Sequence, residues 1–146
     1  MVTSGTGAST TEVPKPERRE GRDARAYLLV ALGGVVGALC RHGVTVAVGG
    51  SLGHAAWGTF VANISGAFLL GFIMTLSVRG VPLPLDARRF VAVGVLGSYT
   101  TFSTLSYETW QLIEGGNLVG ATANALGSLA AGLLAVVAGV ALAKNL

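Results

Sequence analysis

Four long apolar segments joined by short polar connections limit the folds open to this chain more than any other feature. The segments cover about residues 27–48, 57–78, 90–113 and 118–143. At about 1.5 Å per helical residue, each is long enough to cross a hydrocarbon core about 30 Å thick. Because lipid offers no partner to backbone amides and carbonyls, segments of this length cross it as helices. The sequence therefore predicts an all-α membrane protein with four transmembrane helices.

The distribution of charge predicts the orientation of these helices. Of the ten Lys and Arg residues, all but Arg41 lie in the N-terminal 26 residues, in the connection 79–89 or at the C terminus. An even number of crossings puts these three regions on one side of the membrane. The positive-inside rule then predicts a multi-pass protein of the inner (plasma) membrane with both termini in the cytoplasm. Because the net charge of +3 serves orientation in this way, no nucleic-acid partner is expected.

The ends of the chain and the reactive residue types narrow the function classes. Residues 1–26 are rich in polar and charged residues, so we expect a disordered cytoplasmic tail followed by one transmembrane domain over 27–146. The only cysteine, Cys40, lies in an apolar run and has no cysteine to pair with. No phosphate-binding loop, zinc motif or nucleophile elbow is present, which argues against an enzyme and against an ATP-driven pump.

The third apolar segment carries an unusual run of hydroxyl groups. Two glycines, Gly94 and Gly97, precede Ser98-Tyr99-Thr100-Thr101, and Ser103 and Thr104 follow Phe102. Glycine, β-branching and competing local hydrogen bonds all weaken an α-helix. The pattern predicts that the third helix is interrupted near residues 97–101, beside a polar pathway. The alternative is that the same small and hydroxylated residues serve close helix packing.

Isolated polar residues in the other segments have similar alternatives. Arg41 either faces a neighbouring helix or extends to the interface as an anchor. Asn63 is either a hydrogen bond between helices or part of a pathway opposite the polar third segment. Glu108 is an interfacial residue, a partner of Arg41 or part of a vestibule. Asn124 and Ser128 are four residues apart, so they share a polar stripe that we expect to point inward.

Three motifs carry a resemblance to a known family. They are Gly33-Gly34-Val35-Val36-Gly37-Ala38 followed by Arg41, Gly58 to Phe68 around Asn63, and Gly94 to Thr104 with its Thr-Thr-Phe-Ser-Thr run. Each motif alone has little specificity, but the three together, in this order, closely resemble the CrcB/Fluc family of fluoride channels. The resemblance covers about residues 29–143 and leaves only the polar tail outside.

The resemblance implies a passive fluoride channel that lowers cytoplasmic fluoride and so confers fluoride resistance. In that family two subunits pair antiparallel, with two narrow pores and a central sodium ion. Main-chain carbonyls hold the sodium, and they map to Ser98, Tyr99 and Thr100 with a margin of one residue that includes Gly97. Arg41 and Glu108 are assigned an electrostatic or vestibule role. The residues assigned to the fluoride pore are Asn63, Phe102, Ser103, Thr104, Asn124 and Ser128.

One position departs from the family pattern. Where the family usually has a second phenylalanine after Thr-Thr-Phe-Ser-Thr, this chain has Leu105. Leucine lacks the electropositive ring edge that an anion can meet, so a pore that depends on this position should conduct poorly. A protein that inserts in both orientations also needs a weak charge bias, and this one has a strong bias. We therefore expect a heterodimer with an oppositely oriented homologue, with pairing to itself as the alternative.

Two other functions fit a small four-span protein. Small multidrug-type exporters carry a membrane-embedded glutamate in the first span, whereas the first two spans here contain no carboxylate. A non-conducting accessory subunit is compatible with Leu105 but leaves the hydroxyl-rich segment unexplained. A fluoride channel subunit is the function that accounts for most of the pattern.

Overall fold

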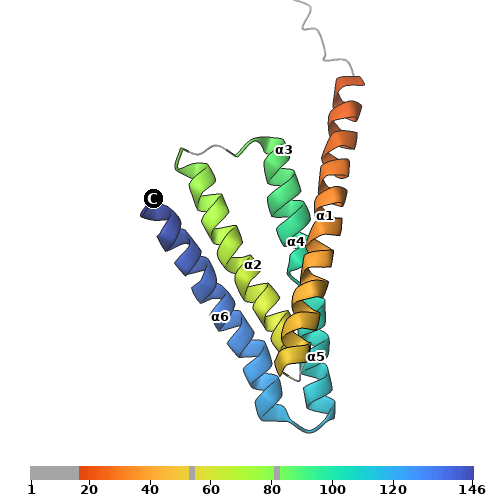
Figure 1. Ribbon diagram of the computed structural model, residues 1–146, viewed down its shortest axis with the longest axis vertical. Helices are drawn as coiled ribbons and strands as arrows, with labels where there is room; N and C mark the ends of the chain where they lie inside the picture. The colour runs from red at the N-terminus through yellow and green to blue at the C-terminus, as the bar shows by residue number, and fades with distance from the viewer. Residues whose placement is uncertain (1–16, 53–54, 81–82) are drawn as a thin grey trace, which may run out of the picture.

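The computed structural model describes residues 17–52, 55–80 and 83–146, and this part of the chain is all-helical. Two long helices come first, and a chain of shorter helical pieces separates them from the last long helix (Figure 1). The elements are α1 (Glu17–Leu52), α2 (Ala55–Val78), α3 (Leu85–Arg88), the π-helical η1 (Arg89–Leu96), α4 (Gly97–Tyr99), α5 (Phe102–Glu114) and α6 (Leu118–Lys144).

Three of these helices are long and apolar enough to cross a membrane. The apolar parts run over Asp23–Ser51, Ala56–Val78 and Leu118–Lys144. They coincide with the first, second and fourth predicted spans, so the prediction of an all-helical membrane protein is confirmed. The third predicted span, 90–113, falls on η1, α4 and α5, which are individually too short to cross.

The N-terminal part differs from the predicted boundary. α1 begins at Glu17, ten residues before the expected start of the first span at residue 27. Arginine, glutamate and alanine favour helix, so the charged run can extend the helix past its apolar part. Arg25 also forms an ion pair with Asp86 of α3, with 2.8 Å between Nη2 and Oδ2. The expected disorder of residues 1–16 lies outside the described residues.

Close helix contacts depend on small residues. Gly37 of α1 lies against the backbone of Val95 in η1, and Gly139 of α6 lies against the backbone of Phe68 in α2. Figure 1 shows the start of α1, the end of α2 and the end of α6 toward one end of the molecule. The end of α1, the start of α2 and the turn between α5 and α6 lie toward the other end. The first described helix thus starts, and the last one ends, on the same side of the bundle.

Two residues between α4 and α5 leave the helical conformation. Thr100 has φ −87° and ψ 154°, and Thr101 has φ −148° and ψ 116°, so both are extended. Extended residues cannot continue the helical hydrogen-bond ladder. The partners that replace the ladder define the candidate site.

Candidate ion pathway

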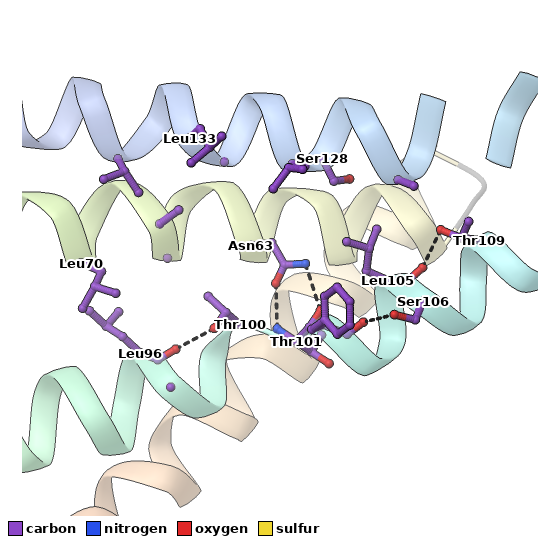
Figure 2. A pocket seen from close by; sticks show the side chains of 18 of the residues that line it. Asn63, Leu70, Leu96, Thr100, Thr101, Leu105, Ser106, Thr109, Ser128 and Leu133 are labelled. Carbon is purple, nitrogen blue, oxygen red and sulfur yellow. Dashed lines mark hydrogen bonds between the residues drawn. The ribbon is translucent and has the colours of Figure 1, made fainter. Parts of the chain in front are cut away.

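Asn63 holds the extended residue Thr101 through both ends of its side-chain amide. Its Oδ1 accepts a hydrogen bond from the Thr101 amide at 2.7 Å, and its Nδ2 donates to the Thr101 carbonyl at 3.1 Å. Figure 2 draws both bonds side by side. A buried backbone amide or carbonyl without a partner costs about 1 to 3 kcal/mol. Asn63 therefore stabilises the extended conformation by giving both polar backbone groups of Thr101 a partner.

Thr101 in turn caps the helix that follows it. Its Oγ1 accepts from the Thr104 amide at 3.3 Å, which is the usual N-cap bond. The same oxygen lies 3.0 Å from the Thr104 hydroxyl and 3.2 Å from the Ser103 hydroxyl. The N-terminus of α5 thus combines three hydroxyl groups with the positive end of a helix dipole. Such a cluster can donate hydrogen bonds to an anion.

The C-terminal end of α4 presents carbonyl oxygens. In a continuous helix the Thr101 amide would pair with the Gly97 carbonyl, but here it binds Asn63 instead. The amide and hydroxyl of Thr100 both turn back to the Leu96 carbonyl, at 3.2 and 3.1 Å. Neutral oxygens are ligands that suit a hard cation such as sodium. The expected ligand set of Gly97, Ser98, Tyr99 and Thr100 therefore has suitable chemistry.

Arg41 lies at the same helix end. Its Nε donates to the Ser98 carbonyl at 3.2 Å, so this carbonyl already has a cationic partner. Arg41 reaches a neighbouring helix and does not extend alone to the interface, which was the other possibility. Of the four carbonyls expected to face sodium, Ser98 is consequently the least free to do so.

Arg41 also borders a small pocket of about 190 Å³. The hydroxyl of Thr59, another residue that borders it, donates to Oε1 of Glu108 at 2.7 Å. Glu108 is only 8% exposed, and its Oε2 has no hydrogen-bond partner in the described part of the chain. No ion pair between Arg41 and Glu108 is found among the residues described. The residues bordering the pocket are Ala38, Arg41, His42, Thr45, Thr59, Thr101 and Thr104.

A larger groove of about 770 Å³ runs along α2, α5 and α6 (Figure 2). Its walls are mostly apolar, and Leu105 is one of the residues lining it. Ser128 is 6% exposed, and within the described residues its hydroxyl has no partner. Phe102 is 81% exposed. The polar lining consists of Asn63, Thr100, Thr101, Ser106, Thr109 and Ser128.

The structure separates the residues predicted for the pore into groups. Asn63, Phe102 and Ser128 line the groove, and Thr104 lines the small pocket. Ser103 and Asn124 line neither of them. Asn124 instead donates to the Thr109 hydroxyl at 3.0 Å and so joins α6 to α5.

Sequence reasoning overlooked Thr59, His42 and Thr45 as pocket-lining residues. Thr59 lies four residues before Asn63, so the two share a helix face, and this spacing could have identified it. Thr45 likewise lies four residues after Arg41, so the same spacing could have identified it. His42 had no comparable signal, because only the packing of the helices brings it to the pocket.

Comparison with known proteins gives the family. The model of the family described as "CrcB-like protein, Camphor Resistance (CrcB)" matches residues 28–140. A protein from Thermus thermophilus, named "Fluoride-specific ion channel FluC", is 52% identical over 109 residues, which are 74% of this chain and 85% of that protein. A protein of the same name from Geobacter sulfurreducens is 39% identical over 120 residues, covering 82% of this chain and 97% of that protein.

These relatives are named as channels and not as enzymes, and the match spans the described helical bundle from α1 to α6. Together with three helices able to cross a membrane, it confirms the resemblance found in the sequence. The chain belongs to the CrcB-like family of membrane proteins.

Proposed function

We propose that this chain is a subunit of a fluoride channel that lets fluoride leave the cytoplasm passively. The observation that carries the proposal is its 52% identity to a protein named as a fluoride-specific channel, over most of both chains. The geometry supports it, because hydroxyls that could donate to an anion lie at the N-terminus of α5 beside a groove. Passive outflow would be enough to lower cytoplasmic fluoride and confer resistance.

The third membrane crossing in this proposal consists of η1, α4 and α5, interrupted at Thr100 and Thr101. Non-helical backbone at membrane depth persists only where protein or a water-filled cavity surrounds it. Asn63 provides the protein partner on one side, and the groove lies on the other. With this crossing the bundle has four spans.

Fluoride is small and strongly hydrated, so a selective pathway must replace its water with donors. The proposed donors are the hydroxyls of Ser103, Thr104 and Ser128 and the ring edge of Phe102. The Ser128 hydroxyl supports this role because it is buried and has a proton to offer in the described structure. Asn124 and Asn63 act mainly by fixing the shape of the pathway. Asn124 is hydrogen-bonded to Thr109, and Asn63 is hydrogen-bonded to Thr101.

Positive potential would come from Arg41 and from a sodium ion at the end of α4. When bound, sodium would attract the anion without binding it in the pore. Gly97, Tyr99 and Thr100 are the residues proposed to hold it, since Arg41 engages the Ser98 carbonyl. Glu108, bound to Thr59, is proposed to shape the adjoining vestibule.

The groove requires a partner subunit. It is open and lined by exposed apolar residues such as Phe102 and Leu126, which a second, antiparallel subunit would cover. The strong charge bias favours insertion in one orientation, with both termini on the cytoplasmic side of the inner membrane. The proposed partner is therefore an oppositely oriented homologue, and a heterodimer results.

The test is fluoride efflux from liposomes, recorded with a fluoride electrode. The purified chain is reconstituted alone and again after co-expression with an oppositely oriented homologue from the same cell. Efflux only from the pair is expected. Efflux from the chain alone would contradict the heterodimer but keep the channel, and absence of efflux in both preparations would contradict the channel.

A non-conducting accessory subunit is the second candidate, and Leu105 is the observation that favours it. Leu105 lines the groove where an aromatic ring would be expected. Replacing Leu105→Phe should increase efflux from the pair if the ring edge contributes to conduction. Loss of efflux on substituting Phe102→Ala in this chain, with assembly intact, would exclude the accessory function.

A further inference from the structure

The hydroxyl of Tyr99 makes a contact with α2 that is not part of the ion pathway proposed above. Tyr99 Oη lies 2.9 Å from Ser65 Oγ of α2. Ser65 Oγ donates to the Val61 carbonyl at 2.7 Å, which leaves its oxygen able to accept from Tyr99. Neither Tyr99 nor Ser65 lines the groove or the small pocket described above. The pair therefore acts on the backbone and not directly on a passing ion.

This bond is one of three contacts by which α2 holds successive residues of the interruption. Ser65 holds Tyr99, and Asn63 holds Thr101. Between them Gly66 leaves room for Thr100, because a Cβ at position 66 would collide with the Thr100 methyl group and lie 3.1 Å from the Tyr99 ring. The carbonyls of Tyr99 and Thr100 are thus fixed between two hydrogen-bonded points.

We propose that Tyr99 is a positioning residue that orients the carbonyl oxygens at the end of α4 for a monovalent cation. The inference rests on the proposed function, which puts sodium at this helix end. A phenylalanine would fill the same space, so the specific contribution of the tyrosine hydroxyl is to fix the orientation of the residue and of its carbonyl. Cation affinity depends on oxygen positions to a fraction of an ångström, which makes one fixed bond measurable.

The experiment measures the sodium dependence of thermal unfolding for the full chain, co-purified in detergent with the oppositely oriented homologue used in the efflux test, with N-methylglucamine balancing the salt. The variant Tyr99→Phe should raise the sodium concentration for half-maximal stabilisation about threefold to tenfold, the effect of losing one neutral hydrogen bond. Ser65→Ala should give the same shift, and the double variant should shift it no further. The matched control is Tyr107→Phe, an exposed tyrosine of α5, which should behave as wild type.

Each other outcome has a distinct meaning. If sodium does not stabilise the wild-type protein, the proposed cation site fails, whatever the variants do. If sodium stabilises the wild type and Tyr99→Phe keeps the same half-maximal concentration, the inference is overturned even if the unfolding temperature falls. Additive shifts for Tyr99→Phe and Ser65→Ala would also overturn it. Ser65→Ala tests the bond from the α2 side should Tyr99→Phe fail to fold.

Discussion

At the scale of single residues, the polar side chains of this protein mostly serve the backbone. Asn63 pairs with both polar groups of Thr101, and the Arg41 guanidinium binds the Ser98 carbonyl. Such contacts stabilise a membrane protein, because a polar group without a protein partner has no water to hydrogen-bond with in the lipid. Substitutions at these positions should therefore affect stability as well as conduction.

Substituting Asn63→Ala removes both partners of Thr101. With two backbone groups unpaired at about 1 to 3 kcal/mol each, we expect a large fall in unfolding temperature and loss of fluoride efflux. Thermal unfolding in detergent and liposome efflux measure the two effects. Asn145→Ala, at the exposed end of α6, is the control and should change neither appreciably. An unaltered unfolding temperature for Asn63→Ala would contradict the role assigned to its amide.

Thr59 is expected to be important for the buried carboxyl of Glu108. The variant Thr59→Val keeps the shape but removes the donor to Oε1, leaving both carboxyl oxygens without a partner among the described residues. We expect destabilisation of about 1 to 3 kcal/mol, the cost of leaving a buried polar atom without its partner. Thr59→Ser retains the hydroxyl and should stay within about 1 kcal/mol of wild type. Equal unfolding free energies for the two variants would rule out the hydrogen bond as the cause.

At the scale of elements, the helices approach one another where glycine exposes the backbone. Gly139 brings α6 against Phe68 and Phe72 of α2, and Gly71 brings α2 against Val136 of α6. In membranes such small residues favour association, because lipid gives no hydrophobic drive between helices. The α2 and α6 pair is thus held by close packing along its length, and this packing forms one wall of the groove.

Two glycine variants of α6 separate packing from helix propensity. In Gly139→Ala the new Cβ would collide with the Phe68 carbonyl, so α6 must move away and the protein should lose stability by about 1 to 3 kcal/mol. Gly127→Ala adds a Cβ in open space and should stabilise the helix slightly, by about 0.5 to 1 kcal/mol. Unfolding free energies measured in the same detergent compare them. Similar changes for both would contradict tight packing at position 139.

At the scale of the whole molecule, the start of α1, the end of α2 and the end of α6 lie on one side (Figure 1). Arg79 at the end of α2 donates to the carbonyl of Lys144 at the end of α6, which joins these ends directly. Arg25 and Arg89 both pair with Asp86, which ties the start of the bundle to α3. Arg25, Arg79, Arg89 and Lys144 are thus gathered on this side of the bundle.

This arrangement predicts a single orientation. A reporter fused to the C terminus should signal only the cytoplasmic position, because the positive-inside rule acts on all three basic regions together. Replacing Arg79, Arg88 and Arg89 with Gln should produce a mixed population by weakening that bias. A wild-type fusion found in both orientations in about equal amounts would remove the main support for a heterodimer.

The sequence alone was enough for the class of the protein and pointed to the region of its candidate site. Apolar length predicted three helices that are able to cross a membrane, since such a helix must be about 20 residues long whatever its neighbours. The hydroxyl-rich run also pointed to the region where Thr100 and Thr101 are extended. The start of α1 was misplaced, because charge suggests exposure but does not prevent helix formation.

Only the tertiary structure decided what each polar side chain binds. The sequence left Asn63 open between packing and pathway, and Glu108 open among three roles. The packing of α2 against α4, α5 and the residues between them brings three pairs into hydrogen-bond contact. These pairs are Asn63 with Thr101, Ser65 with Tyr99 and Thr59 with Glu108. The physical reason is the difference between local and long-range interactions. Membrane insertion depends on the composition of one segment, whereas these hydrogen bonds need two atoms from segments distant in the sequence to lie about 3 Å apart.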